Sequence, residues 1–123
     1  MIGDMKIIEQ YIASWNETDA DGRRALIDEV FAADAAYTDP MAELHGRDEI
    51  AAGIAGVQQM FPGLVFSLAG LVDFHHNQAR FTWHLGPADG GEPVVIGFDV
   101  AVLDLAGQIE SVLGFLDKVP AAA

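Results

Sequence analysis

The spacing of apolar residues changes once along this chain of 123 residues, and that change constrains the fold more than any other feature. Up to residue 61 apolar residues recur every three or four positions, which is typical of helices that bury one side. From residue 64 onward they alternate with polar residues, as in strands that bury one face. Helices followed by long, closely connected strands favour an α+β domain, with helices on one face of an antiparallel sheet, over a doubly wound parallel sheet.

Three helices are predicted in the first part of the chain. Asp4 can cap the first, the second ends near Ala33, and the third begins after Gly46 and stops at Pro62. A short strand over residues 35–40, ended by a proline, separates the second helix from the third. The apolar stripes of the helices are Met5, Ile8, Ile12 and Trp15, then Leu26, Ile27, Val30 and Phe31, and finally Ile50, Ile54, Val57 and Phe61.

Four long strands are predicted in the second part, over residues 65–75, 78–85, 94–104 and 109–118. Glycines inside these strands mark points where a sheet can bend or bulge, as a sheet that wraps into a cone must. They are Gly70, Gly97 and Gly114. No repeat or linker divides the chain, so residues 1–123 are expected to form a single domain, long enough to bury about two thirds of its unfolded surface.

Composition argues against several classes of protein. Just over half of the residues are hydrophobic and a fifth are charged, which is the balance of a globular domain and not of a disordered chain. Nineteen acidic side chains against six basic ones give a formal charge of −13, so nucleic acid and anionic membrane surfaces should be repelled. The lack of cysteine excludes disulfides and suits the cytoplasm, and no stretch resembles a secretion signal or reaches membrane-spanning length.

The most unusual ionisable residue is Asp99, inside the strand over residues 94–104, where both faces are otherwise apolar. Burial of a carboxyl group there would raise its pKa, and a carboxyl group that stays protonated near neutrality becomes a hydrogen-bond donor. The alternative is an aspartate at a bulge or strand end that reaches water or a backbone amide. The position alone leaves both interpretations open.

A second carboxylate, Asp39, is expected at the end of the short strand, directly before Pro40. An aspartate before a proline is a common turn arrangement. The surrounding residues 37–45, however, include aromatic and apolar side chains, an environment that moves a carboxylate toward the pKa range of a general base. Tyr11, on the stripe of the first helix, is either a core aromatic residue with a satisfied hydroxyl or a member of the same site.

Other chemistry finds little support in the sequence. The four histidines have no metal-ligand spacing, so no metal site is predicted. There is no G-x-S-x-G nucleophile motif, no G-x-G-x-x-G phosphate loop and no P-loop, and no cofactor is expected. Carboxylates and tyrosines therefore remain the only chemically suggestive set, while Trp15 and Trp83 are expected in the core or in the wall of a pocket.

Three runs of residues, taken in order, resemble a known family. They are QYIASWN at residues 10–16, DAAYTDP at residues 34–40 and HGRDEI at residues 45–50. Together they resemble the nuclear-transport-factor-2-like superfamily, in particular its small polyketide-cyclase-like (SnoaL-like) proteins, over nearly the whole chain. The resemblance implies a cone-shaped curved sheet with about three helices enclosing an apolar pocket, and a homodimer formed through the outer face of the sheet.

Within this superfamily the site residues resemble those of ketosteroid isomerase. That enzyme combines an aspartate base before a proline, a tyrosine on the first helix and an aspartate that an apolar site keeps protonated, which match Asp39, Tyr11 and Asp99. The resemblance implies that Asp39 removes a proton next to a substrate carbonyl while Tyr11 and Asp99 donate hydrogen bonds to the enolate oxygen. The aldol-type cyclases of the family carry their acidic residue on a later strand, so Asp99 alone could serve that chemistry. Epoxide hydrolases of this fold use an Arg-x-Asp pair, where this chain has Arg80 followed by Phe81 and Thr82.

Two functions are therefore weighed: an isomerase or cyclase for a hydrophobic, steroid-like or polyketide-like carbonyl compound, and a non-catalytic protein that binds an apolar small molecule. They differ at Asp99 and Tyr11, which must face one point of the cavity to form an oxyanion site. A third possibility is an interaction module that uses the apolar strand 94–103 for a protein partner, although homodimerisation explains that strand equally well. Both pocket functions need the same wall, expected to include Trp15, Tyr37, Met60, Trp83 and Phe115.

Overall fold

The structure is a computed structural model that describes the backbone of residues 2–120 and the side chains of residues 5–120. Three helices and six strands occur in this part of the chain, which confirms the α+β class predicted from the change in apolar spacing. The helices are α1 (Ile2–Asn16), α2 (Ala20–Val30) and α3 (Gly46–Met60). The strands are β1 (Phe31–Thr38), β2 (Glu43–His45), β3 (Leu64–His75), β4 (Gln78–Pro87), β5 (Val95–Leu103) and β6 (Ile109–Lys118).

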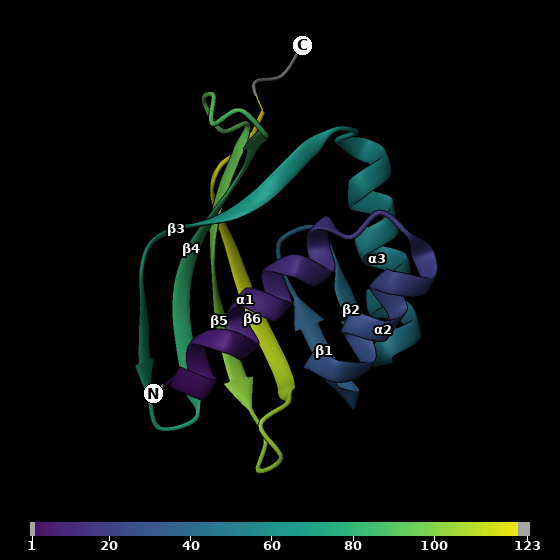
Figure 1. Ribbon diagram of the computed structural model, residues 1–123, viewed down its shortest axis with the longest axis vertical. Coiled ribbons are helices and arrows are strands. Elements are labelled where there is room, and N and C mark those ends of the chain that lie inside the picture. Colours follow the sequence, from purple (N-terminus) through teal and green to yellow (C-terminus); the bar gives the residue numbers. More distant parts are fainter. Residues whose placement is uncertain (1, 121–123) are drawn as a thin grey trace.

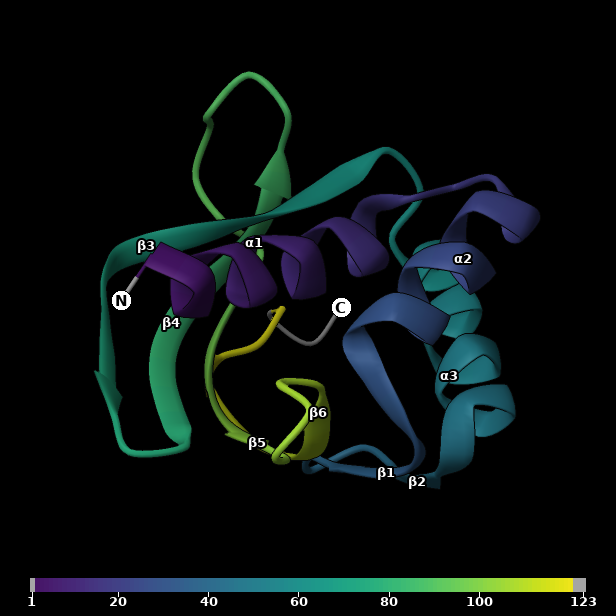
Figure 2. The same cartoon turned by 60° about the horizontal axis from the view of Figure 1, so that its bottom comes forward.

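The six strands form one open, curved sheet in the order β2-β1-β6-β5-β4-β3. Neighbouring strands are antiparallel except β1 and β6, which run parallel. The sheet curls around α1, and α2 and α3 lie beside β1 and β2 at one end (Figures 1 and 2). In β3 a bulge between Ala69 and Asp73 contains Gly70, whose φ of 80° is a conformation that glycine adopts without strain.

The three helices bury the apolar stripes that their spacing indicates. Ile8 of α1, Ile27 of α2 and Ile50 of α3 are all completely buried. The carboxylate of Asp19 caps α2 by accepting a hydrogen bond from the Gly22 N–H at 2.8 Å. Packing of these faces against the concave side of the sheet forms the hydrophobic core and fixes the positions of α1 and α3 over the sheet.

The end of α2 differs from the prediction. The helix ends at Val30 and not near Ala33, because Phe31 already has extended backbone angles and starts β1. Tertiary contacts select this conformation: the Phe31 carbonyl accepts hydrogen bonds from the guanidinium of Arg47, and Phe31 pairs with Ile109 of β6. The Phe31 side chain is buried at the start of β1. It would also be buried on the apolar stripe of a longer helix, so the spacing of apolar residues does not distinguish a helical Phe31 from an extended one.

Two smaller differences concern local structure. The helix α1 begins at Ile2, so Asp4 lies inside it and not at the cap position. The strand β2 was not predicted, because a segment of three residues is too short to carry a recognisable alternation.

The two faces of the sheet differ in what they contact. Buried and half-buried residues alternate along β5, with Gly97 and Asp99 on the concave side that faces the helices. On the convex side, Phe98 stacks on Phe115 with ring centroids 5.2 Å apart, and the Phe115 side chain is 54% exposed. No helix among the described residues has the length and apolar character that crossing a membrane requires.

Candidate functional site

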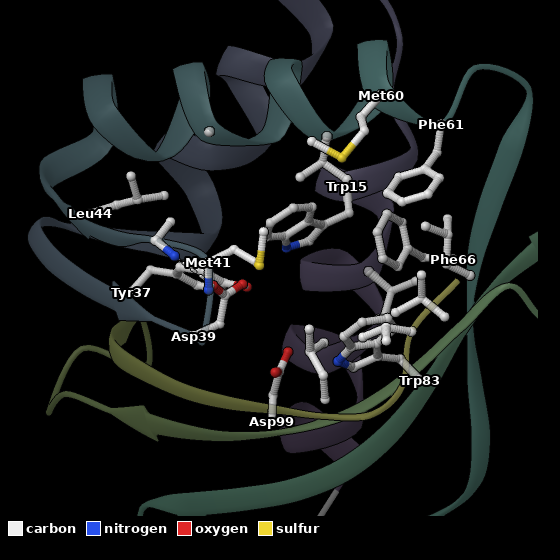
Figure 3. Close-up of a pocket in the computed structure, with 18 of the residues that line it drawn as sticks. Trp15, Tyr37, Asp39, Met41, Leu44, Met60, Phe61, Phe66, Trp83 and Asp99 are labelled. Atoms are coloured by element: carbon white, nitrogen blue, oxygen red, sulfur yellow. Dashed lines mark hydrogen bonds between the residues drawn. The ribbon is translucent and has the colours of Figure 1, made fainter. Parts of the chain in front are cut away.

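An apolar pocket of about 370 Å³ lies between the concave face of the sheet and the helices α1 and α3 (Figure 3). This volume falls at the lower end of the range usual for small-molecule sites. Among the described residues that line it, the carboxyl groups are those of Asp39 and Asp99. The aromatic part of its wall consists of Tyr11, Trp15, Tyr37, Phe61, Phe66 and Trp83.

Asp99 is almost fully buried at the floor of the pocket, with 2% of its surface exposed. Its Oδ2 accepts a hydrogen bond of 2.8 Å from the Tyr11 hydroxyl, whereas its buried Oδ1 has no hydrogen-bond partner. The Trp83 indole N–H points toward this carboxyl group without reaching hydrogen-bond geometry (Figure 3).

Burial controls the ionisation of this pair. Loss of hydration raises the pKa of Asp99 to about 6, the N–H and O–H groups of Trp83 and Tyr11 act in the opposite direction, and the charge of Asp39 raises the pKa further. Burial also raises the pKa of the Tyr11 hydroxyl well above its ordinary value, and the neighbouring Asp99 adds to that effect. Below about pH 6 the site therefore holds a neutral carboxylic acid next to a neutral phenol.

Gly114 makes room for both acidic residues. It pairs with Asp99 across β5 and β6, and a Cβ atom at this position would lie 2.7 Å from Asp99 Oδ1 and 3.3 Å from Asp39 Cβ. The two acidic residues thus lie on either side of one glycine, although they are 60 positions apart in the sequence. The parallel pairing of β1 with β6 produces this proximity, because it places the end of β1 beside Gly114.

Asp39 follows β1 and is held by three hydrogen bonds. Its Oδ2 accepts one of 2.6 Å from the Tyr37 hydroxyl, and its Oδ1 accepts two, from the backbone N–H groups of Met41 at 2.8 Å and Ala42 at 2.9 Å. A carboxylate offers about four acceptor positions, so one remains for a ligand. The turn of residues 39–42 therefore also holds the Asp39 carboxylate in place at the pocket, through the Met41 and Ala42 N–H groups.

Close contacts with glycine and with an amide side chain shape the wall. The Trp83 ring lies against Gly97, where any Cβ atom would overlap it. The amide of Asn16, at the end of α1, exchanges two hydrogen bonds with the backbone of Phe66, at 2.8 and 2.7 Å. The ring of Phe66 lies 5.4 Å from that of Trp15 and 5.3 Å from that of Trp83, which joins the two tryptophans into one aromatic surface.

The structure places seven of the eight candidate residues at this pocket. Those seven are Tyr11, Trp15, Tyr37, Asp39, Met60, Trp83 and Asp99. The expectation for Phe115 is wrong in position: its side chain lies on the convex face, because Gly114 takes the inward position of the alternation on β6. Met60 lies at the rim, where 64% of its surface is exposed.

Sequence reasoning missed several parts of the site. The contact between Asn16 and Phe66 spans 50 positions and follows no periodic pattern. Gly114 was expected as a bend in the sheet, whereas its main effect is the space it leaves for Asp99 Oδ1. The inward positions of the four long strands would have indicated Leu85 and Val95 as lining residues, since alternation assigns them to the face of Asp99.

Among the described residues, no three His, Cys, Asp or Glu side chains are grouped so that they could hold a metal ion. The side chains of Asp39, Asp99 and Tyr11 are suited to acid–base and hydrogen-bonding chemistry.

Comparisons with known proteins agree with this architecture. A proposed isomerase of the SnoaL-like family from Agrobacterium tumefaciens is 42% identical, with a TM-score of 0.89 over 95% of this chain and 99% of that one. A proposed SnoaL-like polyketide cyclase from Jannaschia sp. CCS1 is 18% identical, with a TM-score of 0.74 over 94% of this chain and 86% of that one. A de novo designed protein with a curved β-sheet, 10% identical, has a TM-score of 0.72 over 94% of this chain and 85% of that one.

The latter two similarities show the fold alone. No curated protein matches the sequence. The sequence profile of the SnoaL-like domain matches residues 8–112, most of the described chain. The chain therefore belongs to the SnoaL-like family of nuclear-transport-factor-2-like proteins.

Proposed function

We propose that this protein is an isomerase or cyclase that removes a proton next to a carbonyl group of a hydrophobic, steroid-like or polyketide-like substrate. One observation carries the proposal: the buried Oδ1 of Asp99 has no partner and lies next to the carboxylate-bearing Asp39 in an apolar pocket. The name of the similar protein from Agrobacterium tumefaciens, a proposed isomerase of the SnoaL-like family, points in the same direction.

In this proposal Asp39 is the general base. Its carboxylate accepts the proton from the carbon next to the carbonyl group, and the C–H electron pair moves into the carbonyl to give an enolate. The hydrogen bonds from Tyr37 and the two backbone N–H groups hold the carboxylate in a fixed orientation, so that little reorganisation is needed. An isomerase would return the proton to another carbon. A cyclase would direct the enolate carbon to a second carbonyl group, whose oxygen then takes the proton from Asp39 to become a hydroxyl.

Asp99 is the hydrogen-bond donor to the enolate oxygen. Its pKa of about 6 provides a neutral carboxylic acid in mildly acidic solution, and a proton on Oδ1 would be free to point at the ligand. The Tyr11 hydroxyl donates to Oδ2 of the same group, so it stabilises the charge that Asp99 takes on as it donates. This division of roles differs from that in ketosteroid isomerase, where the corresponding tyrosine and aspartate both donate to the oxygen.

A non-catalytic binding protein is the second candidate. The observation in its favour is that the Tyr11 hydroxyl is already bonded to Asp99 and that Asp39 already accepts three hydrogen bonds. Such satisfied pairs are also found in pockets that only bind. A measurement of catalytic turnover therefore distinguishes the proposed isomerase or cyclase from a non-catalytic binding protein.

The decisive experiment incubates the protein with a β,γ-unsaturated ketosteroid and follows the absorbance of the conjugated enone. We expect enone formation by the wild type and its loss in Asp39→Asn, which keeps the size of the side chain but removes the base. Asp34→Asn, an exposed position on β1, is the matched control and should retain the wild-type rate. No turnover by the wild type, or equal turnover in Asp39→Asn, would remove the isomerase proposal and leave binding as the better account.

The convex face of the sheet supports a proposed homodimer. Phe115 and Leu113 are 54% and 47% exposed there, next to the half-buried Phe98. Association of two such faces would remove these apolar side chains from water. A dimer formed in this way would leave the mouth of the pocket, on the opposite face, open to a small hydrophobic ligand.

A further inference from the structure

Besides Asp99, one more polar group in the pocket is buried without a partner. Among the described side chains, the buried nitrogen and oxygen atoms that lack a hydrogen bond are Asp99 Oδ1 and Trp15 Nε1. Trp15 is 7% exposed and lines the pocket with Asp99. Its indole nitrogen points into the cavity, on the side where Asp39 and Asp99 lie (Figure 3).

The unpaired state of Trp15 Nε1 needs a physical explanation. More than about nine tenths of buried polar groups in proteins are hydrogen-bonded, and an unpaired buried donor destabilises the folded protein. The ring of Trp15 is enclosed by those of Tyr11, Tyr37 and Phe66, at centroid distances between 5.4 and 6.4 Å. The Tyr11 and Tyr37 hydroxyl groups donate to Asp99 and Asp39 and keep acceptor positions of their own. The Trp15 N–H is near enough to Tyr11 to oppose the rise in the Tyr11 pKa, but it reaches hydrogen-bond geometry with neither hydroxyl.

We propose that the Trp15 N–H donates a hydrogen bond to an oxygen of the bound molecule, in addition to the oxygen that Asp99 contacts. The ligand is then an apolar ring compound with two oxygen acceptors on the edge that faces α1 and β5. This inference rests on the pocket of the proposed function and narrows its substrate class from any hydrophobic ketone to a dioxygenated one. It also adds a hydrogen bond to the apolar wall contact that the sequence predicts for Trp15.

The size of the cavity limits the ring system. A volume of about 370 Å³ corresponds to about a dozen water molecules at their volume in the liquid. A bicyclic compound can therefore be enclosed fully, and a larger one can extend through the mouth. The exposed side chains of Met41 and Met60 line that mouth and offer an adaptable apolar contact for the protruding part.

The test compares two bicyclic probes of the same shape, indane-1,3-dione, with two oxygens, and indane, with none. Their dissociation constants are measured by equilibrium dialysis at pH 5.5, where the Asp99 carboxyl group is mostly neutral. Trp15 is replaced by 3-benzothienylalanine, which keeps the shape of the ring and has sulfur in place of N–H. The ratio of the two dissociation constants cancels changes in the apolar wall.

We expect the wild type to prefer the dione, and the replacement to reduce that preference about fivefold, the effect of one neutral hydrogen bond. Trp15→Phe should reduce the preference similarly, with circular dichroism as the check on folding. Phe66→Leu, which changes the neighbouring apolar wall and no donor, should alter both affinities alike and keep the preference.

A wild type without preference for the dione, or a preference that the sulfur replacement changes less than twofold, overturns the inference. Its failure can be told apart from that of the proposed reaction. Turnover of the ketosteroid that depends on Asp39, together with an unchanged preference, refutes only the role of Trp15. A preference that depends on Trp15 without any turnover supports the Trp15 contact and counts against the reaction.

Discussion

Replacement of Asp99 by asparagine should stabilise the protein, and the gain should grow with pH. Asn keeps the shape of the side chain and an oxygen that can accept the Tyr11 hydrogen bond, but it has no charge. In the wild type, the pKa of Asp99 is about 6 in the folded state, above the ordinary value of 3.8. Since the folded-state pKa is the higher one, the contribution of Asp99 to stability is fully present below pH 3.8 and is lost as the pH rises through 6.

The size of the effect follows from the shift. A difference of about two pKa units corresponds to about 3 kcal/mol between the fully protonated and fully ionised limits. Asp99 is only 2% exposed, so solvent screening reduces this figure little. About half of it, between about 1 and 2 kcal/mol, should develop between pH 5 and pH 8.

The assay is urea denaturation of the wild type and of Asp99→Asn at pH 5, 6, 7 and 8. The quantity of interest is the difference in unfolding free energy between the two, because a constant offset from the amide cancels in its pH dependence. With a net charge of −13, removal of any acidic residue relieves some repulsion, and Asp34→Asn measures this general effect. A difference that stays constant from pH 5 to pH 8, or that Asp34→Asn reproduces, would show that Asp99 is not a desolvated acid in the folded protein.

Three further outcomes are expected. The kcat/KM for a turned-over ketone should fall as pH rises through about 6, because donation to the enolate needs the neutral Asp99; a level profile from pH 5 to pH 8 contradicts this. Gly114→Ala should lower the free energy of unfolding, measured by urea denaturation, by about 1–3 kcal/mol, because its Cβ would lie 2.7 Å from Asp99 Oδ1. Gly56→Ala, in a helix with open space around it, should raise that free energy by about 0.5–1 kcal/mol. Equal effects of the two substitutions refute the steric argument. Phe115→Asp should halve the mass found by sedimentation equilibrium, and an unchanged mass, or a monomeric wild type, excludes dimerisation through the convex face.

The sequence was most informative where periodicity extends over a whole element. Alternation along residues 94–103 put Asp99 among apolar residues, and the structure places it at the pocket floor. Alternation along β6 assigns Gly114 inward and Phe115 outward, so the expectation that Phe115 lines the pocket agreed with its aromatic type but not with its position. Long periodic patterns thus predict which face a residue occupies more reliably than residue type does.

Tertiary contacts decide two features that the spacing of apolar residues does not predict: the start of β1 and the hydrogen bond between Tyr11 and Asp99. Phe31 is apolar and buried in either conformation, and only the Arg47 guanidinium and the pairing with β6 decide that it begins a strand. In the same way, the resemblance implied Tyr11 and Asp99 as two parallel donors, whereas the structure links them to each other by a hydrogen bond. Hydrogen bonds between residues 88 positions apart depend on side-chain geometry that a single sequence does not encode in any local pattern.

The position of β6 in the middle of the sheet has a consequence for how the protein forms. This strand comes last among the described strands, yet it alone connects the pair β2-β1 to the three strands β5-β4-β3. A nascent chain that has emerged only to residue 108 therefore holds two separate sheet fragments, each with an open edge. Insertion of β6 joins them and completes the curved sheet, so folding of the sheet must wait until β6 has been synthesised, and the earlier fragments need protection from edge-to-edge association until then.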